Sequence, residues 1–128
     1  MSKYVDGFVF TVPKSKVADY IKMAKEGKKF WMEHGALSYF ECMGDDLKPK
    51  PMGPNKQLAF TTLTKAKPNE TVWFSFITFK SRKHRDEVNK KVMKAMDEKY
   101  KDVDPKDFSM PFDPTRMSYG GFSVEVEG

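Results

Sequence analysis

The segment Thr71–Phe79 (TVWFSFITF) is the strongest predicted strand of the chain, and large apolar side chains occupy both of its alternating sets. Side chains alternate between the two faces of a strand, so a strand with one face in water carries polar residues in one set. Neither set is polar here, which predicts that both faces of the strand are covered. One set is Val72, Phe74, Phe76 and Thr78, and the other is Thr71, Trp73, Ser75, Ile77 and Phe79.

Three further strands are predicted from runs of aromatic and β-branched residues. They are Tyr4–Val12, Leu37–Gly44 and the closing segment Met117–Val126. The Pro-, Lys- and Gly-rich stretch Asp45–Lys56 predicts a loop. We interpret Gln57–Thr64, which follows it, as a short irregular strand.

Two helices are predicted from apolar residues that recur at steps of three and four. The first is expected to begin with Ser15 as its N-cap and to end near His34 and Gly35, where glycine can adopt a left-handed conformation. Ser81 is expected to cap the second helix. The inward stripe of that helix is predicted to be Val88, Val92, Ala95 and Met96.

The elements follow the order strand, helix, strand, strand, helix, strand. Residues 97–116 are expected to be mostly irregular and anchored by Phe108, Met110 and Phe112. This order is that of the ferredoxin-like α+β fold, an antiparallel sheet with both helices on one face. The 128 residues suit one such domain, 1–128. No element is left for the second sheet face, so we expect a homodimer whose sheets pack together as a dimeric α+β barrel.

Composition and charge exclude several classes of protein. Hydrophobic residues make up 39% of the chain, which is enough for a packed core. Lys and Arg number 23 against 18 Asp and Glu, and they are scattered among the acids, which argues against a nucleic-acid-binding face. No apolar run approaches the roughly 18 residues of a membrane helix, and no signal peptide is recognisable. We therefore expect a cytoplasmic protein without membrane contact.

Three residues are candidates for catalytic proton transfer. His34, at the end of the first helix, can titrate near neutral pH, or it can simply complement the negative helix end. Asp6 and Glu41 share strand faces with large apolar residues, where a carboxylate needs a partner or water. Either carboxylate could act as an acid or base in a cavity, or it could lie at the rim of the sheet and pair with a lysine.

A basic segment, Lys80–Arg85, begins the second helix, where the helix dipole disfavours cations. Cations beside free N–H groups predict an anion site, whereas compensation by Asp86 and Glu87 and pairing across a dimer interface is the structural alternative. The residues that we expect to contact a substrate are Arg82, His84, Arg85 and Arg116, with Trp31 and Tyr119 as aromatic walls.

Metal, cofactor and nucleophile motifs are missing from the sequence. Two histidines and one cysteine, none at metal-binding spacing, predict no metal site and no disulfide. The pair Gly120-Gly121 lies in a predicted strand, where it indicates a bulge or a close approach rather than a phosphate-binding loop. No nucleophile elbow supports Ser-His-Asp catalysis, and no cofactor is expected.

Four segments in order, Tyr4–Phe8, His34–Leu37, Lys80–Asn89 and Met110–Phe122, resemble the YbaA-like family of small bacterial cytosolic proteins of unknown function. The resemblance extends over nearly the whole chain and is weakest over Asp45–Asn69. It implies a subunit of the dimeric α+β barrel superfamily. Members of that superfamily include cofactor-independent monooxygenases, haem-degrading enzymes and lactone isomerases, which use the cavity between sheet and helices. The resemblance implies no particular activity, because a fold hosts many functions.

Three functional hypotheses follow. The first is a homodimer that binds a small organic or anionic molecule in the cavity between sheet and helices, with proton transfer or oxygenation as the chemistry if it is an enzyme. The second is a non-catalytic interaction module that docks an acidic protein segment on Lys80–Arg85. The third, RNA binding, ranks last because the strands lack the aromatic and basic signature of an RNA-recognition motif.

Overall fold

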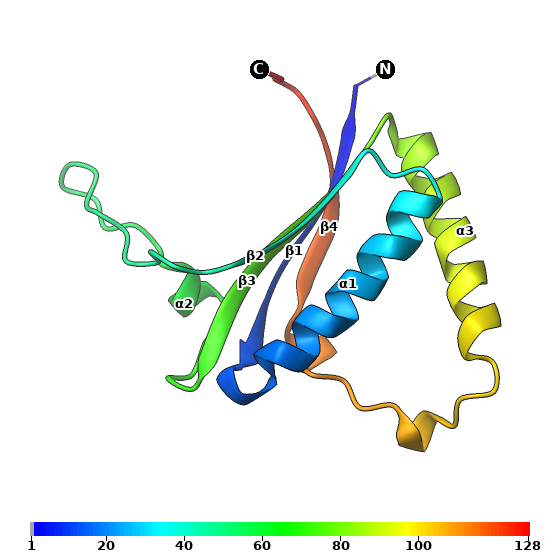
Figure 1. Ribbon diagram of the computed structural model, residues 1–128. Coiled ribbons are helices and arrows are strands. Elements are labelled where there is room, and N and C mark those ends of the chain that lie inside the picture. The colour runs from blue at the N-terminus through cyan, green and yellow to red at the C-terminus, as the bar shows by residue number, and fades with distance from the viewer. Residues whose placement is uncertain (1) are drawn as a thin grey trace.

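The computed structural model, which describes residues 2–128, contains a four-stranded antiparallel sheet (Figure 1). Its strands lie in the spatial order β2-β3-β1-β4. Each strand is antiparallel to its neighbours, and β1 pairs with both β3 and β4. The predicted α+β class with an antiparallel sheet is thereby confirmed. The strands are β1 (Tyr4–Pro13), β2 (Ser38–Met43), β3 (Glu70–Phe79) and β4 (Ser118–Ser123).

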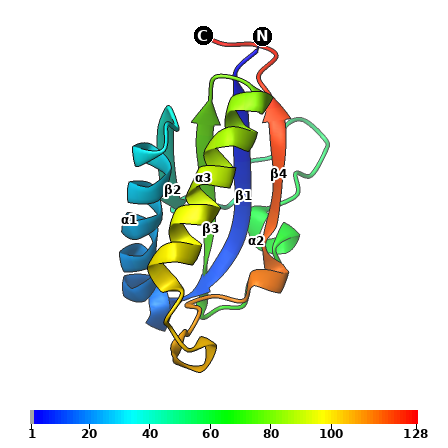
Figure 2. The same cartoon turned by 90° about the vertical axis from the view of Figure 1, so that its right-hand side faces the viewer.

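Two long helices lie on the same face of this sheet, as Figure 2 shows. They are α1 (Val17–Glu33), which lies nearer β2, and α3 (Arg82–Tyr100), which crosses in front of the central strands. A third, short helix, α2 (Phe60–Leu63), lies away from them. Within residues 2–128, no helix is both long enough and apolar enough to cross a membrane.

The core lies between the helices and the inner face of the sheet. Phe10 and Val12 of β1 and Phe79 of β3 are almost fully buried against this helical layer. On α3, Val88 and Val92 are equally buried, and Ala95 and Met96 pack beside them. The inward stripe predicted from helical spacing is therefore confirmed, and one alternating set of β3 faces the helices as expected.

The helix ends agree with the sequence at two places and differ at a third. Ser81 caps α3, because its hydroxyl accepts a hydrogen bond from the His84 backbone N–H. Gly35 follows α1 with a φ of 111°, as predicted for a glycine after a helix. The predicted N-cap Ser15 is wrong: Lys14–Lys16 forms a 3-10 turn, and α1 begins at Val17 without a side-chain cap. The rigid Pro13 starts this turn early and leaves Ser15 inside it.

Three other local predictions are corrected. The segment 57–64 holds α2 rather than an irregular strand, because it lies beyond the sheet and satisfies its backbone locally, with the Leu63 N–H donating to the Ala59 carbonyl. Phe108 does not anchor the chain, since its side chain is 54% exposed. The closing strand is shorter than Met117–Val126, because pairing with β1 stops where β1 begins, at Tyr4.

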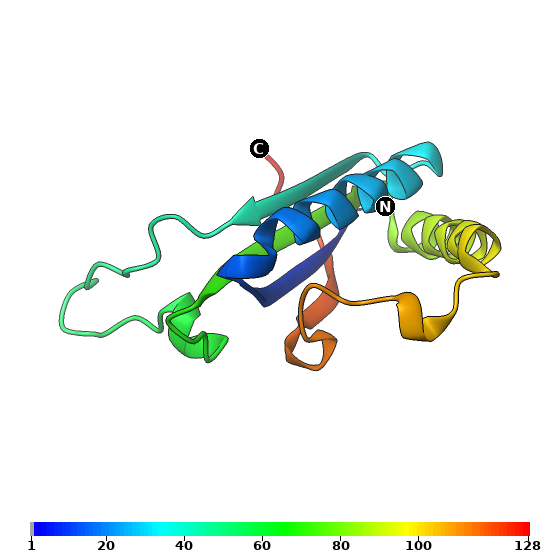
Figure 3. The same ribbon diagram turned by 60° about the horizontal axis from the view of Figure 1, so that its bottom comes forward.

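The second face of the sheet, which we call the outer face, is defined by Val9, Phe40, Phe74, Phe76 and Phe122. No helix of the described residues covers its centre, and the rings of Phe40, Phe74 and Phe122 are 50%, 47% and 62% exposed. An extended arm, residues 44–59, projects on this side of the sheet, opposite α1 and α3 (Figures 1 and 3). The outer face is thus an apolar surface that the single chain leaves open, and the arm, which carries Asp and Lys residues beside Met52 and Leu58, projects from the same side.

Candidate functional site

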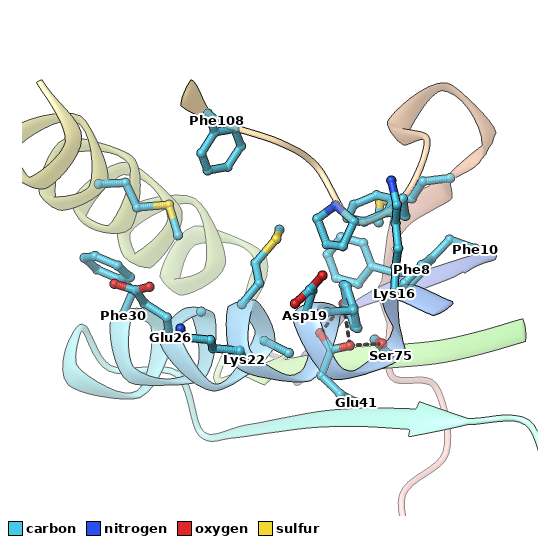
Figure 4. A pocket seen from close by; sticks show the side chains of 18 of the residues that line it. Phe8, Phe10, Lys16, Asp19, Lys22, Glu26, Phe30, Glu41, Ser75 and Phe108 are labelled. Atoms are coloured by element: carbon cyan, nitrogen blue, oxygen red, sulfur yellow. Dashed lines mark hydrogen bonds between the residues drawn. The ribbon is translucent and has the colours of Figure 1, made fainter. Parts of the chain in front are cut away.

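A cavity of about 970 Å³ lies between α1, the inner face of the sheet and the segment that follows α3 (Figure 4). Aromatic side chains contribute strongly to its walls: Phe8 and Phe10 come from β1, and Phe30 and Trp31 come from α1. Phe108 hangs from the segment after α3 across the cavity from β2 (Figure 4). The long connection 101–117 therefore closes a space that the two helices leave between them.

The Glu41 carboxylate lies on the floor of this cavity beside Ser75 (Figure 4). It accepts hydrogen bonds from three different hydroxyl groups. The Tyr20 hydroxyl lies 2.7 Å from Oε2 and 2.9 Å from Oε1 of Glu41. The Tyr39 hydroxyl donates to Oε1 at 3.0 Å, and the Ser75 hydroxyl donates to Oε2 at 2.6 Å. The cluster joins α1, β2 and β3, because Tyr20 comes from the helix and the other partners come from neighbouring strands.

Antiparallel register explains how this cluster forms. Glu41 stands opposite Ser75 in the pairing of β2 with β3, and Tyr39 precedes Glu41 by two residues on the same face. Burial, strengthened by Glu41, raises the pKa of the Tyr20 and Tyr39 hydroxyls far above the ordinary value of 10. Both phenols therefore stay protonated at physiological pH and remain donors to the carboxylate.

The residues that we expected to transfer protons do not lie together. Glu41 lines the cavity, but Asp6 and His34 are outside its lining. His34 follows the last turn of α1, and its Nδ1 lies 2.7 Å from the Phe30 carbonyl oxygen. This contact is the helix-end arrangement that the sequence offered as the alternative to a catalytic role.

Asp6 instead forms a buried ion pair with Arg85, at 2.6 Å between Oδ1 and Nη1. The Asn89 side-chain amide donates to the other oxygen of Asp6 at 3.3 Å and accepts from the Trp31 indole N–H at 3.0 Å. The Arg85 guanidinium also lies over the Tyr4 ring, 4.8 Å from its centroid. This network fixes α3 to β1 and to α1, and of its members only Trp31 lines the cavity.

The other expected substrate contacts are also outside the cavity lining. Arg82 is exposed at the start of α3, and His84 accepts the Lys80 backbone N–H at its Nδ1. Arg116 forms two hydrogen bonds with the Glu70 carboxylate, at 2.6 and 3.1 Å. Tyr119, on β4, is 75% exposed and stacks on Phe8. The cations proposed for an anionic ligand thus lie in two places: Arg82, His84 and Arg85 in the first turn of α3, and Arg116 beside Glu70.

The close approach predicted at Gly120-Gly121 occurs at Gly121, where an added Cβ would clash with the Tyr4 ring and hydroxyl. Three polar residues of the cluster around Glu41 were missed in the sequence: Tyr20, Tyr39 and Ser75. A usable signal existed for two of them. Ser75 is the polar exception in the buried set of β3, and Tyr39 alternates with Glu41, so both point to a polar place within an apolar face. Tyr20 had no such signal, because only the packing of α1 brings it to the sheet.

Comparison with known proteins gives concordant matches. Residues 3–114 match the model of a family described as "Protein of unknown function (DUF1428)". The chain is 42% identical over 127 residues to the uncharacterized protein YbaA of Escherichia coli strain K12, and the alignment covers 98% of each chain. The same values hold for the uncharacterized protein YbaA of Shigella flexneri. The resemblance found in the sequence is therefore confirmed, and the names of these relatives state no activity.

Proposed function

Because the chain belongs to the DUF1428 family of proteins of unknown function, we propose its function from its own geometry: it binds a small, largely apolar organic molecule between α1, α3 and the sheet. The observation that carries this proposal is the cavity of about 970 Å³ with many aromatic lining residues and a hydrogen-bonded cluster around Glu41 on its floor. Ligand sites commonly have volumes of about 300–1,000 Å³ and combine apolar walls with a few placed polar groups.

Binding rather than catalysis is the function that this geometry supports. Of the three residues expected to transfer protons, Glu41 alone lines the cavity, and its hydroxyl partners are held protonated. The residues expected to hold an anion, Arg82, His84, Arg85 and Arg116, lie outside the cavity lining. The cavity therefore favours an organic ligand that carries no negative charge.

We further propose that the protein is one ferredoxin-like domain that acts as a homodimer, a dimeric α+β barrel. The order β2-β3-β1-β4 with α1 and α3 on one face supports the ferredoxin-like arrangement. The occupant that we assign to the outer face is a second copy of the chain. This face carries no charge that would oppose its pairing with the same face of a second copy. The arm projects on the same side, and its mostly exposed residues Met52 and Leu58 can contact that copy.

The cavity can be tested with N-phenylnaphthylamine, a neutral dye whose fluorescence rises in apolar surroundings. We expect saturable binding with one site per chain. Met23→Trp fills the cavity from α1 and should weaken binding about tenfold or more, since one decade corresponds to about 1.4 kcal/mol.

Met32→Trp is the matched control, because Met32 lies on the same helix, is 40% exposed and is outside the lining of the cavity. This variant should bind the dye like the parent protein. A parent protein that shows no saturable fluorescence, or two variants that bind the dye equally well, would refute the proposed function.

A further inference from the structure

The Glu41 carboxylate lacks a counter-charge. It lies at the floor of an apolar cavity, and its partners are the neutral hydroxyls of Tyr20, Tyr39 and Ser75. Glu41 is half-buried, and among residues 2–128 two carboxylates whose side chains are only 8% exposed have arginine partners: Asp6 pairs with Arg85, and Glu70 pairs with Arg116. Glu41 forms no such ion pair. Charges inside proteins are normally paired, so a cation is the missing element of this cluster.

The carboxylate also retains the capacity to accept another hydrogen bond. Each of the three hydroxyls carries one proton, so together they supply three donors. A carboxylate offers about four acceptor positions, which leaves about one for a group that enters the cavity. The hydroxyl oxygens add further acceptors, because their protons point toward Glu41. The floor of the cavity is therefore rich in acceptors and poor in free donors.

The walls suit a cation as well as an apolar body. The rings of Tyr20, Tyr39 and Trp31 line the cavity beside the carboxylate, and the face of an aromatic ring attracts an ammonium group. The lysines of the lining, Lys16 and Lys22, are both exposed and lie on α1 or just before it, away from the floor. No arginine or histidine contributes to the lining within the described part of the chain.

From these three features we infer that the ligand is an amine: a protonated nitrogen on a hydrophobic or aromatic body, with the nitrogen at Glu41 and the body between the aromatic walls. This inference rests on the proposed binding function and narrows its ligand class. It also replaces the anionic ligand that the basic segment Lys80–Arg85 suggested, because Arg85 of that segment is held by Asp6.

Three ligands of equal size separate the inference from the function on which it rests: phenylbutylamine, phenylbutanol and phenylbutyrate. They share one body and carry a cation, a neutral hydroxyl and an anion. In displacement of N-phenylnaphthylamine from the parent protein, we expect the amine to bind about tenfold more tightly than the alcohol, and the anion to bind weakest.

Glu41→Gln should make the amine and the alcohol bind about equally, because it removes the charge and keeps the shape. Glu70→Gln is the matched control, since Glu70 is a buried, hydrogen-bonded carboxylate outside the cavity lining, and its variant should keep the preference for the amine. If Glu41→Gln fails to fold, Asp19→Asn serves instead: Asp19 is exposed at the cavity edge, and its loss should weaken the amine about threefold and leave the alcohol unchanged.

Each outcome of these experiments supports or contradicts one of the two proposals. Equal binding of amine and alcohol to the parent protein, or tightest binding of the anion, would overturn the amine inference and leave the binding function intact. A preference that survives in Glu41→Gln would overturn the role of Glu41. If the dye itself does not bind, the proposed function fails first.

Discussion

The Asp6 carboxylate is 6% exposed, and side chains from α3 hold both of its oxygens. Removing one partner of a buried ion pair leaves the other charge without compensation, at a cost of about 3–5 kcal/mol. We therefore expect Arg85→Met to lower the free energy of unfolding by about 3 kcal/mol in urea denaturation at neutral pH. The double variant Asp6→Asn, Arg85→Met should recover a large part of that loss, because it removes both charges.

Arg82→Met provides the control for this pair, since Arg82 is exposed and lies three residues earlier in the same helix. It should change the free energy of unfolding by less than about 0.5 kcal/mol. Equal effects of the two single variants would mean that the Asp6–Arg85 pair contributes nothing to stability.

For single residues, the sequence predicted the chemistry of the side chains better than it predicted which residues would lie beside them. It singled out Asp6 and Glu41 as charges in need of partners, and Arg85 as a substrate contact or a cation compensated by Asp86 and Glu87. Arg85 does pair with Asp86, at 2.7 Å. The partners Arg85 of Asp6 and Tyr20 of Glu41 were not predicted, because they are 79 and 21 residues away. Such pairs form through helix-on-sheet packing, which no local pattern encodes.

At the scale of elements, Arg116 connects three segments at the lower end of the sheet. Its guanidinium donates to both oxygens of Glu70, at the start of β3, and to the carbonyls of Thr64 and Lys65 after α2. Thr11 of β1 donates to the same carboxylate at 3.4 Å. This arrangement holds the turn after α2 against the entry to β4, and it does so without any apolar contact that the sequence pattern could have revealed.

Hydrogen bonds from Arg116 lower the pKa of Glu70 from 4.5 to about 2. A carboxylate with a lowered pKa in the folded protein stabilises it above its unfolded pKa, and this stabilisation is lost as the pH falls through the folded value. Glu70→Gln should therefore be about 2 kcal/mol less stable than the parent protein at pH 7, the range for hydrogen bonds to charged groups. The difference should shrink between about pH 4.5 and about pH 2, measured by urea denaturation at each pH.

Glu127→Gln is the control for the loss of a carboxylate that is not buried. The Glu127 carboxylate is exposed and pairs with Lys3 at the chain ends. Its stability difference from the parent should be small at every pH. A Glu70→Gln difference that stays constant from pH 7 to about pH 2 would contradict the assigned role of the ionised carboxylate.

Element prediction succeeded where a periodic pattern is long and failed where it is short. The core helices and β1 and β3 follow from nine or more residues of consistent spacing. The four-residue α2 was mistaken for a strand because Thr and Leu suit both structures. Its helical turn is fixed by its position beyond the sheet edge and by a hydrogen bond from the Thr64 hydroxyl to the Phe60 carbonyl. In the segment after α3, the predicted irregular chain and the anchors Phe112 and Met110 are confirmed, whereas Phe108, which was also expected to be an anchor, faces the cavity.

In the whole molecule, the two faces of the sheet differ in how much apolar surface they expose, and this difference bears on how copies of the chain assemble. The inner face is buried by α1 and α3, whereas the centre of the outer face carries large exposed rings, Phe40, Phe74 and Phe122 among them. Contiguous apolar surface of this kind is uncommon on monomeric proteins and marks interaction sites. The prediction of covered faces on both sides of β3 thus leads from one nine-residue segment to an expectation about the assembled protein.

If a second copy covers the outer face, a charge placed at its centre must be desolvated on assembly and will oppose pairing. We expect the parent protein to have twice the protomer mass at micromolar concentration by light scattering after size exclusion, and Phe74→Glu to have the protomer mass. Phe108→Glu is the matched control, because Phe108 has a similar exposure, 54% against 47%, and lies on the helical side of the sheet. This control should keep the dimer mass, which separates an effect of the outer face from the effect of any added charge. If the parent protein is a folded monomer at this concentration, the assignment of a second copy to the outer face is contradicted. The cavity on the other side of the sheet would then function within a single chain.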